Sequence, residues 1–100
     1  MASASAGTFS KHKGRRVLIV DAGITIGGKS AVKIARISSA RPKGSVRFFE
    51  TKKFLGDYWI LLDQVSVVTT TELVDPWSGS NRLKPGELDT VRKEIAKIAG

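Results

Sequence analysis

The stretch that decides the fold is Asp57-Tyr-Trp-Ile-Leu-Leu-Asp-Gln64, an apolar run that begins with an acidic residue and ends in Asp-Gln. Its aromatic and branched side chains predict a strand over 57–62, and residues 65–69 are predicted to continue it or to form a neighbouring strand. Residues 51–56 are predicted to be a connector in front of it. The turn-rich residues 70–82 predict a loop with a short helical turn.

A closing helix is predicted from Arg82-Leu-Lys-Pro-Gly-Glu-Leu-Asp89 onward. Pro85 suits a first helical turn, where its missing N–H is not needed, and Glu87 suits the positive end of the helix dipole. Lys84 stands at the cap position and offers no capping acceptor. An apolar stripe follows at helical spacing, formed by Leu88, Val91, Ile95 and Ile98.

The first half of the chain predicts shorter strands separated by turns. Arg16–Asp21 is a continuous aliphatic run typical of a buried strand, and the glycine-rich residues 22–30 are predicted to turn. Residues 31–39 fit either a helix or a strand. The strand is preferred, because the turn signal Arg41-Pro-Lys-Gly44 and a strand-like run over 45–50 follow, and the two strands would form a hairpin.

This order of elements predicts a fold class and a domain organisation. Short strands with one closing helix imply a mostly β (α+β) fold, a small antiparallel barrel with a C-terminal α-helix, rather than a layered α/β sheet. One hundred residues suffice for a single core. Residues 1–14 are predicted to form a flexible basic arm, and residues 15–100 the barrel domain.

The net charge of +8 is concentrated in the first half of the chain. Residues 1–50 hold ten Lys or Arg and two acidic residues, whereas residues 51–100 hold seven of each sign. Such segregation favours a polyanionic partner, because neutralising phosphates releases counterions; a solvated basic face is the plainer explanation. The absence of cysteine excludes a disulfide framework and a thiolate metal site, and the single histidine, His12, cannot build a metal centre alone. No run is apolar enough for a membrane span or a signal peptide, so a cytoplasmic location is expected.

Four stretches resemble the MazF/PemK family of toxin endoribonucleases. Arg15-Arg-Val-Leu-Ile-Val20 is similar to the family's strand that begins with the catalytic arginine, and Ile37-Ser38 to its Ile-Thr pair. The strand from Asp57 to Gln64 and the helix start from Arg82 to Leu88 match two further family patterns. The resemblance covers about residues 7–100 and is firmer after Val32.

This resemblance implies a fold, a reaction and a set of partners. It implies an SH3-like barrel that acts as a homodimer, cuts single-stranded RNA without a metal or cofactor, and is held by an acidic antitoxin protein. The 2′-hydroxyl would attack the adjacent phosphorus, leaving a 2′,3′-cyclic phosphate and a 5′-hydroxyl. By the same resemblance Arg15 and Ser38 are the catalytic pair. The expected RNA-binding residues are Arg16, Lys29, Ser39, Arg41, Lys43, Asp57 and Gln64.

The residue types suit that reaction. A guanidinium keeps its charge and can fork onto two phosphate oxygens, and a serine hydroxyl can donate a second hydrogen bond to the same oxyanion. Family members usually also begin with a Gly-Asp-Ile/Val strand. Nothing in residues 1–14 resembles that strand, so an exposed sheet edge is expected in its place.

Two alternatives belong to other functional classes. Gly23-Ile-Thr-Ile-Gly-Gly-Lys-Ser30 matches the phosphate-cradling P-loop pattern after a strand, and residues 31–39 would then be its helix. A nucleotide binder of that kind normally needs a parallel sheet, for which the chain has too few crossovers. The other alternative is a barrel that holds RNA or a partner without cutting it.

Aromatic side chains lie between basic ones over residues 47–59. Phe48 and Phe49 must point to opposite faces of a strand, as must Tyr58 and Trp59. One member of each pair is expected in the core. The other could stack on a base or fill a dimer interface, and the pattern does not decide which member is which.

Overall fold

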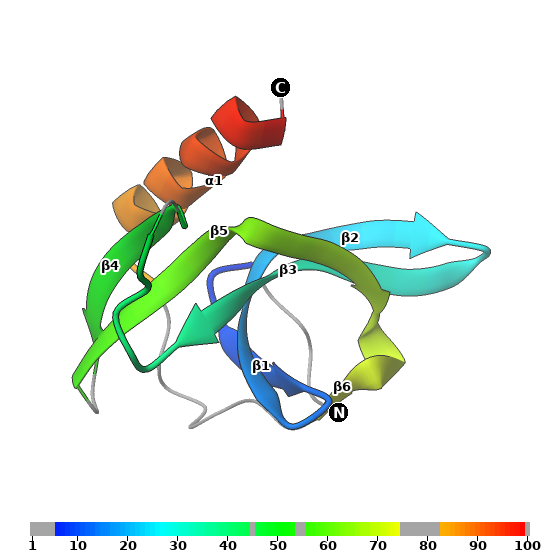
Figure 1. Cartoon of the computed structure of the whole chain (residues 1–100). Coiled ribbons are helices and arrows are strands. Elements are labelled where there is room, and N and C mark those ends of the chain that lie inside the picture. The colour runs from blue at the N-terminus through cyan, green and yellow to red at the C-terminus, as the bar shows by residue number, and fades with distance from the viewer. Residues whose placement is uncertain (1–5, 45, 54–55, 75–82, 100) are drawn as a thin grey trace.

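One antiparallel sheet and one helix make up the part of the chain that the computed structural model describes, residues 6–44, 46–53, 56–74 and 83–99 (Figure 1). The elements in chain order are β1 (Phe9–His12), β2 (Arg15–Ile26), β3 (Lys29–Ser38), β4 (Phe48–Lys53), β5 (Gly56–Thr69), the 3₁₀ turn η1 (Thr70–Glu72), β6 (Leu73–Val74) and α1 (Pro85–Ala99).

The six strands lie in the order β4-β5-β3-β2-β1-β6, and every pair of neighbours is antiparallel. The long strand β5 curves across the sheet, and η1 then turns the chain so that β6 pairs with β1 (Figure 1). The edges β4 and β6 do not pair with each other, so the sheet is strongly curved but open. The predicted fold class, mostly antiparallel β with a C-terminal helix, is confirmed, and the barrel is an approximate description.

The two faces of the sheet bury different apolar clusters. Alternate residues of β2 point to opposite faces, so Leu18 and Val20 join the larger cluster against α1, while Val17 and Ile19 join a smaller one. The larger cluster also holds Tyr58, Ile60 and Leu62 of β5 with Val91 and Ile95 of α1. The face away from α1, called here the inner face, carries Val17, Ile19, Val32 and Ile34 and the residues described below as the site.

Strand β1 corrects the prediction for the start of the chain. Residues 9–12 form a paired strand rather than a flexible arm, with Phe9 opposite Leu18 and only 1% exposed. The N–H of Gly7 donates to the carbonyl of Ile19 at 2.7 Å, and the N–H of Leu83 donates to the carbonyl of Gly7 at 2.8 Å. Burial of one phenylalanine and these backbone bonds fix the segment, so the expected lack of a first strand is wrong. The arm prediction for residues 1–5 lies outside the described residues.

A long β2–β3 hairpin replaces the loop predicted over residues 22–30. Strand β2 continues to Ile26, and Gly27 and Gly28 alone make the turn, with φ of 55° and 79°. Positive φ at both central residues suits the type I′ turn of a two-residue hairpin, and glycine adopts it without strain. Residues 29–38 form the preferred strand and not a helix. The strand–loop–helix context that the P-loop pattern needs is therefore absent from residues 15–38.

The partner of the strand predicted over 45–50 is also corrected. Strand β4 pairs with β5, from Phe48 opposite Leu61 to Lys53 opposite Gly56, and not with β3. Strand β5 lies between β3 and β4 because its apolar residues Ile60 and Leu62 are buried in the main core. Residues 51–53, predicted as part of a connector, extend β4.

The closing helix is confirmed; it is capped at its start and bound to β2 near its middle. The backbone N–H of Lys84 donates to Oε1 of Glu87 at 3.1 Å, which compensates for the missing capping side chain. Arg92 donates from Nε to the carbonyl of Val20 at 3.1 Å, and its Nη2 lies 2.9 Å from Oδ1 of Asp21. Three residues of the predicted stripe contact the core, whereas Ile98 is 36% exposed. Within the described residues, no helix has the length and apolar character needed to cross a membrane.

Candidate nucleic-acid interface

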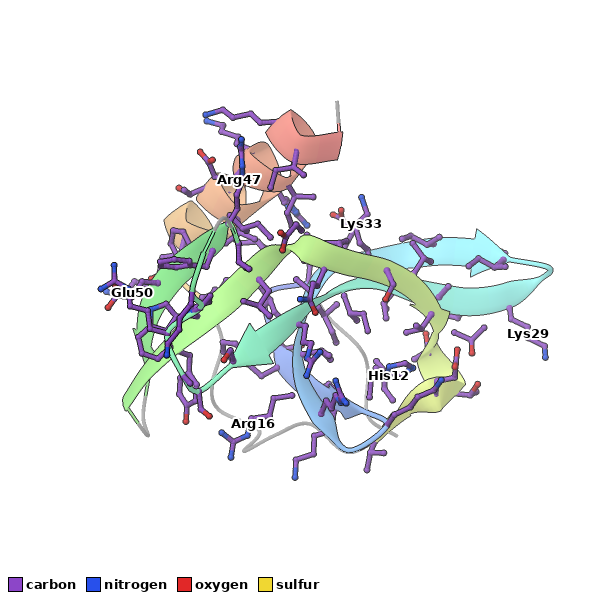
Figure 2. The ribbon with its side chains drawn as sticks, viewed as in Figure 1. His12, Arg16, Lys29, Lys33, Arg47 and Glu50 are labelled. Atoms are coloured by element: carbon purple, nitrogen blue, oxygen red, sulfur yellow. The ribbon has the colours of Figure 1, made fainter. Side chains whose placement is uncertain are left out.

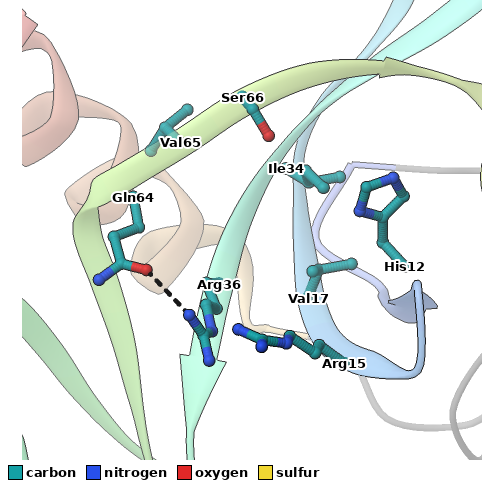
Figure 3. Close-up of a pocket in the computed structure, with 8 residues that line it drawn as sticks. All are labelled: His12, Arg15, Val17, Ile34, Arg36, Gln64, Val65 and Ser66. Atoms are coloured by element: carbon teal, nitrogen blue, oxygen red, sulfur yellow. Dashed lines mark hydrogen bonds between the residues drawn. The ribbon is translucent and has the colours of Figure 1, made fainter.

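A hollow of about 310 Å³ opens on the inner face, between β1, β2, β3 and β5 (Figure 3). Polar side chains occupy its rim, and aliphatic side chains of β2 and β3, Val17 and Ile34, form its floor. The lining residues are His12, Arg15, Val17, Ile34, Arg36, Gln64, Val65 and Ser66.

Strand register brings the two arginines of the hollow together. Val17 of β2 is opposite Arg36 of β3, so Arg36 points to the inner face. Arg15 lies two residues before Val17 and points to the same face, since side chains alternate along a strand. Figure 3 shows the Arg15 guanidinium directed toward Arg36 on the neighbouring strand, while the Arg36 guanidinium is directed toward Gln64.

A bulge in β5 supplies the third polar group. Ala35 pairs with Val65 but Arg36 pairs with Leu61, so residues 62–64 are extra on the β5 side. Such an insertion bends a strand and redirects a side chain. Gln64 reaches the rim of the hollow in this way, and its Oε1 accepts a hydrogen bond from Nη1 of Arg36 at 3.4 Å (Figure 3).

The hollow is strongly positive. Both guanidinium groups stay charged at every physiological pH, and no carboxylate is among the lining residues. Arg15 is exposed and has no hydrogen bond or ion pair with any other described residue. Two like charges at one hollow repel each other unless an anion lies between them. The arrangement is therefore suited to a phosphate group, which accepts forked hydrogen bonds from arginine.

His12 borders the hollow on the side of η1. Its Nε2 is buried, lies 3.5 Å from Oε1 of Glu72, and has no hydrogen bond within the described part of the chain. Oε2 of Glu72 accepts the backbone N–H and the hydroxyl of Thr69, each at 3.0 Å. These bonds, with a smaller contribution from His12, lower the pKa of Glu72. The Glu72 carboxylate therefore faces the His12 imidazole at the border of the hollow.

Ser38, the expected partner of Arg15, is bonded elsewhere. Continuing the β2–β3 register by two residues would set Ser38 opposite Arg15, but the pairing of these strands ends at Val17 and Arg36. The Ser38 hydroxyl donates to the carbonyl of Ala40 at 2.6 Å and accepts the N–H of Ala40 at 3.1 Å. It is not among the lining residues. Its only proton is used in a local turn.

The other predicted RNA-binding residues are scattered. Lys29 lies at the tip of the β2–β3 hairpin, far from Arg16 (Figure 2). The Arg16 guanidinium lies 5.8 Å from the centre of the Tyr58 ring, on the opposite face of the sheet from Arg15.

Ser39, Arg41 and Lys43 are exposed in the segment after β3. Asp57 pairs through its backbone with Lys52 near the β4–β5 turn, and its side chain lies outside the described residues. Of the predicted set, the hollow gathers Arg15 and Gln64.

Two functional candidates were not predicted from the sequence. The alternation of side chains along a strand over residues 31–39 indicates that Arg36 shares a face with Ile34. Its approach to Gln64 depends on the β5 bulge, which has no local signature. His12 would have required recognition of β1, in which a single buried aromatic residue stands among polar ones.

The aromatic pairs divide as expected, and the structure now assigns the members. Phe49 and Tyr58 belong to the core against α1. Trp59 and Phe48 are half-buried on the inner face. The Arg41 guanidinium lies 5.9 Å from the centre of the Phe48 ring, within the range of a cation–π contact.

Among the described residues no three His, Cys, Asp or Glu side chains lie close enough together to hold a metal ion. Neither a protein-family model nor a curated protein sequence matches this chain.

Proposed function

We propose that this protein binds single-stranded RNA across the inner face and cleaves it at the hollow that Arg15 and Arg36 border. The observation that carries the proposal is the pair of guanidinium groups directed at one hollow with no carboxylate in its lining. The net charge of +8 favours the approach of a polyanion to this surface. The resemblance to the MazF/PemK family adds the class of reaction.

The reaction is an internal transesterification. The ribose 2′-oxygen forms a bond to the adjacent phosphorus, and the bond from phosphorus to the 5′-oxygen breaks. The products are a 2′,3′-cyclic phosphate and a 5′-hydroxyl, so the proton lost by the 2′-hydroxyl is balanced by one gained by the leaving oxygen. RNA is required because DNA lacks the 2′-hydroxyl.

Arg15 and Arg36 would hold the non-bridging phosphate oxygens. Negative charge on these oxygens grows as the fifth bond to phosphorus forms, and fixed donors stabilise it without rearrangement. Arg36 takes the second-donor role that the resemblance gives to Ser38, because the Ser38 proton is already bonded to Ala40. Gln64 fixes the Arg36 side chain through its 3.4 Å hydrogen bond.

Proton transfer requires a group that titrates near neutral pH, which a guanidinium does not. A neutral imidazole has one nitrogen that donates and one that accepts, and His12 supplies the imidazole in the lining of the hollow. We therefore assign the proton from the 2′-hydroxyl to His12, whose Nε2 lies 3.5 Å from Oε1 of Glu72.

The proposal includes the partners that the resemblance implies. A homodimer would extend the RNA-binding surface over two copies of the chain. An acidic antitoxin segment would place carboxylates on Arg15 and Arg36 and exclude RNA from the same hollow. The system would then be a toxin–antitoxin pair acting in the cytoplasm.

A non-catalytic barrel that binds RNA or a protein partner is the second candidate. The local bonds of Ser38 favour it, since one of the two expected catalytic groups is withdrawn from the hollow. The two candidates share the phosphate-binding residues and differ only in whether a bond is broken.

Incubation with a long single-stranded RNA in the presence of EDTA separates these candidates. The nuclease predicts discrete fragments with 5′-hydroxyl ends, lost in Arg15→Ala and in Arg36→Ala. Lys29→Ala is the matched control, since it removes one positive charge at the hairpin tip and should leave cleavage unchanged. Retention of intact RNA, abolished by the same two substitutions, supports the binding barrel. If the RNA is neither cleaved nor retained, both candidate functions are contradicted.

A further inference from the structure

We propose that Trp59 and Glu50 form a base-binding subsite for guanine, beside the phosphate-binding hollow. This inference rests on the proposed function, because it names the nucleotide that the same surface would select. It uses residues that the reaction itself does not need.

Strand register sets these residues in one row across the sheet. Ser38 of β3 is opposite Trp59 of β5, and Trp59 is opposite Glu50 of β4. The neighbouring row holds Arg36, Leu61 and Phe48. Side chains opposite each other on one face have Cβ atoms about 5 Å apart, and diagonal neighbours about 7–8 Å. Trp59 is the diagonal neighbour of Arg36, so a phosphate at Arg36 and a base at Trp59 are within the reach of one nucleotide.

Trp59 presents part of its ring on the inner face. Its neighbours in sequence, Tyr58 and Ile60, are buried against α1, whereas Trp59 is half-buried and belongs to neither apolar cluster. Aromatic rings in such positions stack on unpaired bases, and stacking is the usual way in which proteins hold single-stranded nucleic acid. Arg41, in contact with the Phe48 ring, lies next to the same row and adds positive charge for the backbone.

Glu50 explains why guanine is selected. Its carboxylate is exposed and makes no hydrogen bond or ion pair with a described residue. A carboxylate offers two acceptor oxygens and no donor. The Watson–Crick edge of guanine has two adjacent donors, N1–H and the N2 amino group, whereas adenine and cytosine each present one amino donor there. A negative charge is unfavourable beside RNA unless it is paired in this manner.

The charge pattern of the chain agrees with a dedicated role for this carboxylate. Residues 1–50 contain ten basic residues but only two acidic ones, Asp21 and Glu50. Asp21 is bound to Arg92. Glu50 therefore remains as the acceptor for a base on a surface that otherwise attracts phosphate. Figure 2 shows Glu50 on β4, at the opposite end of the sheet from the Lys29 hairpin tip.

Tryptophan fluorescence tests the stacking step. In the Trp77→Phe variant Trp59 is the remaining tryptophan. The probes are short oligonucleotides with a 2′-deoxy sugar at the attacking position, so that they bind without being cleaved. They carry guanosine, inosine or adenosine at one site. We expect quenching of Trp59 and about tenfold tighter binding of guanine than of inosine, which lacks the N2 amino group. Glu50→Gln should remove that preference while anisotropy still detects binding.

The outcomes separate this inference from the proposed function. Binding that requires Arg15 but neither quenches Trp59 nor distinguishes guanine from inosine overturns the subsite and leaves the phosphate site intact. Equal preference in the parent and in Glu50→Gln overturns the role of the carboxylate. No binding of any oligonucleotide to the parent overturns the proposed function, and the subsite with it. Circular dichroism checks that Glu50→Gln and Trp77→Phe keep the β-rich fold.

Discussion

Arg36 donates a hydrogen bond of 3.4 Å to the side-chain oxygen of Gln64, from the strand that faces the β5 bulge. This contact joins Arg36, which pairs just beyond the register shift, to Gln64 within the bulge. It holds the Arg36 guanidinium beside Gln64 at the rim of the hollow, and the Arg15 guanidinium is directed toward Arg36 from the neighbouring strand (Figure 3). The irregularity in β5 is therefore the feature that builds the hollow.

The first prediction concerns the shape of the Arg36 head group. Arg36→Lys keeps the charge but loses the planar fork and the geometry that Gln64 fixes. We expect the rate of RNA cleavage at saturating substrate to fall by about 10²-fold, with a smaller effect on binding. Lys29→Arg, at the hairpin tip, is the control and should change neither. Equal rates for Arg36→Lys and the parent would show that a single diffuse charge suffices.

The second prediction separates Ser38 from the reaction. Ser38→Ala removes two local hydrogen bonds with Ala40. We expect a loss of about 1 kcal/mol in the free energy of unfolding, measured with urea, and no change in the cleavage rate. A rate loss of a hundredfold with unchanged stability would return Ser38 to the role that the family resemblance gives it.

The third prediction concerns β1. Phe9 is 1% exposed and packs in the main cluster, so Phe9→Ala leaves a large cavity. We expect a loss of about 3–5 kcal/mol in the free energy of unfolding, measured by chemical denaturation. Lys11→Ala, at an exposed position of the same strand, should cost less than about 0.5 kcal/mol. Similar small effects of both substitutions would mean that residues 9–12 do not contribute a strand.

The fourth prediction concerns pH and Glu72. Hydrogen bonds from the Thr69 N–H and hydroxyl, with a smaller contribution from His12, lower its pKa from the ordinary 4.5. Because the folded state then binds its proton less readily than the unfolded chain, Glu72 stabilises the fold above pH 4.5, and this contribution is lost as the pH falls through the folded pKa.

Melting temperatures across that window test the sign. Glu72→Gln should melt below the parent at neutral pH, and the difference should shrink as the pH falls below 4.5. Glu50→Gln is the control, since its carboxylate has no hydrogen bond with a described residue, and it should melt with the parent throughout. A difference in melting temperature that grows toward acidic pH would show that folding does not lower the pKa of Glu72.

The elements that rest on local pattern were predictable from the sequence. The apolar run of residues 57–62 and the spacing of Leu88, Val91 and Ile95 act over a few residues, and both elements were confirmed. The preference for a strand over 31–39 also held, and it removed the structural basis of the P-loop alternative.

The features that depend on distant parts of the chain were not predictable. Strand β4 pairs with β5 rather than with β3 because β5 lies between them in the sheet. The position of a strand in the sheet depends on how all the strands pack together, and not on its local sequence. Strand β1 rests on Phe9, one apolar side chain among polar ones, and on backbone bonds to Ile19 and Leu83. The site shows the same limit, because Arg15 was identified by resemblance, whereas Arg36 joins it only through register and the bulge.

The most direct test of the central claim is a double-mutant cycle on metal-free RNA cleavage, with Arg15→Ala, Arg36→Ala and the double variant. If both guanidinium groups hold one phosphate, each single variant should lose about 10²–10³ in rate, and the double variant much less than the product of the two losses. Cleavage at the parent rate by either single variant, or products without 5′-hydroxyl ends, would contradict the account.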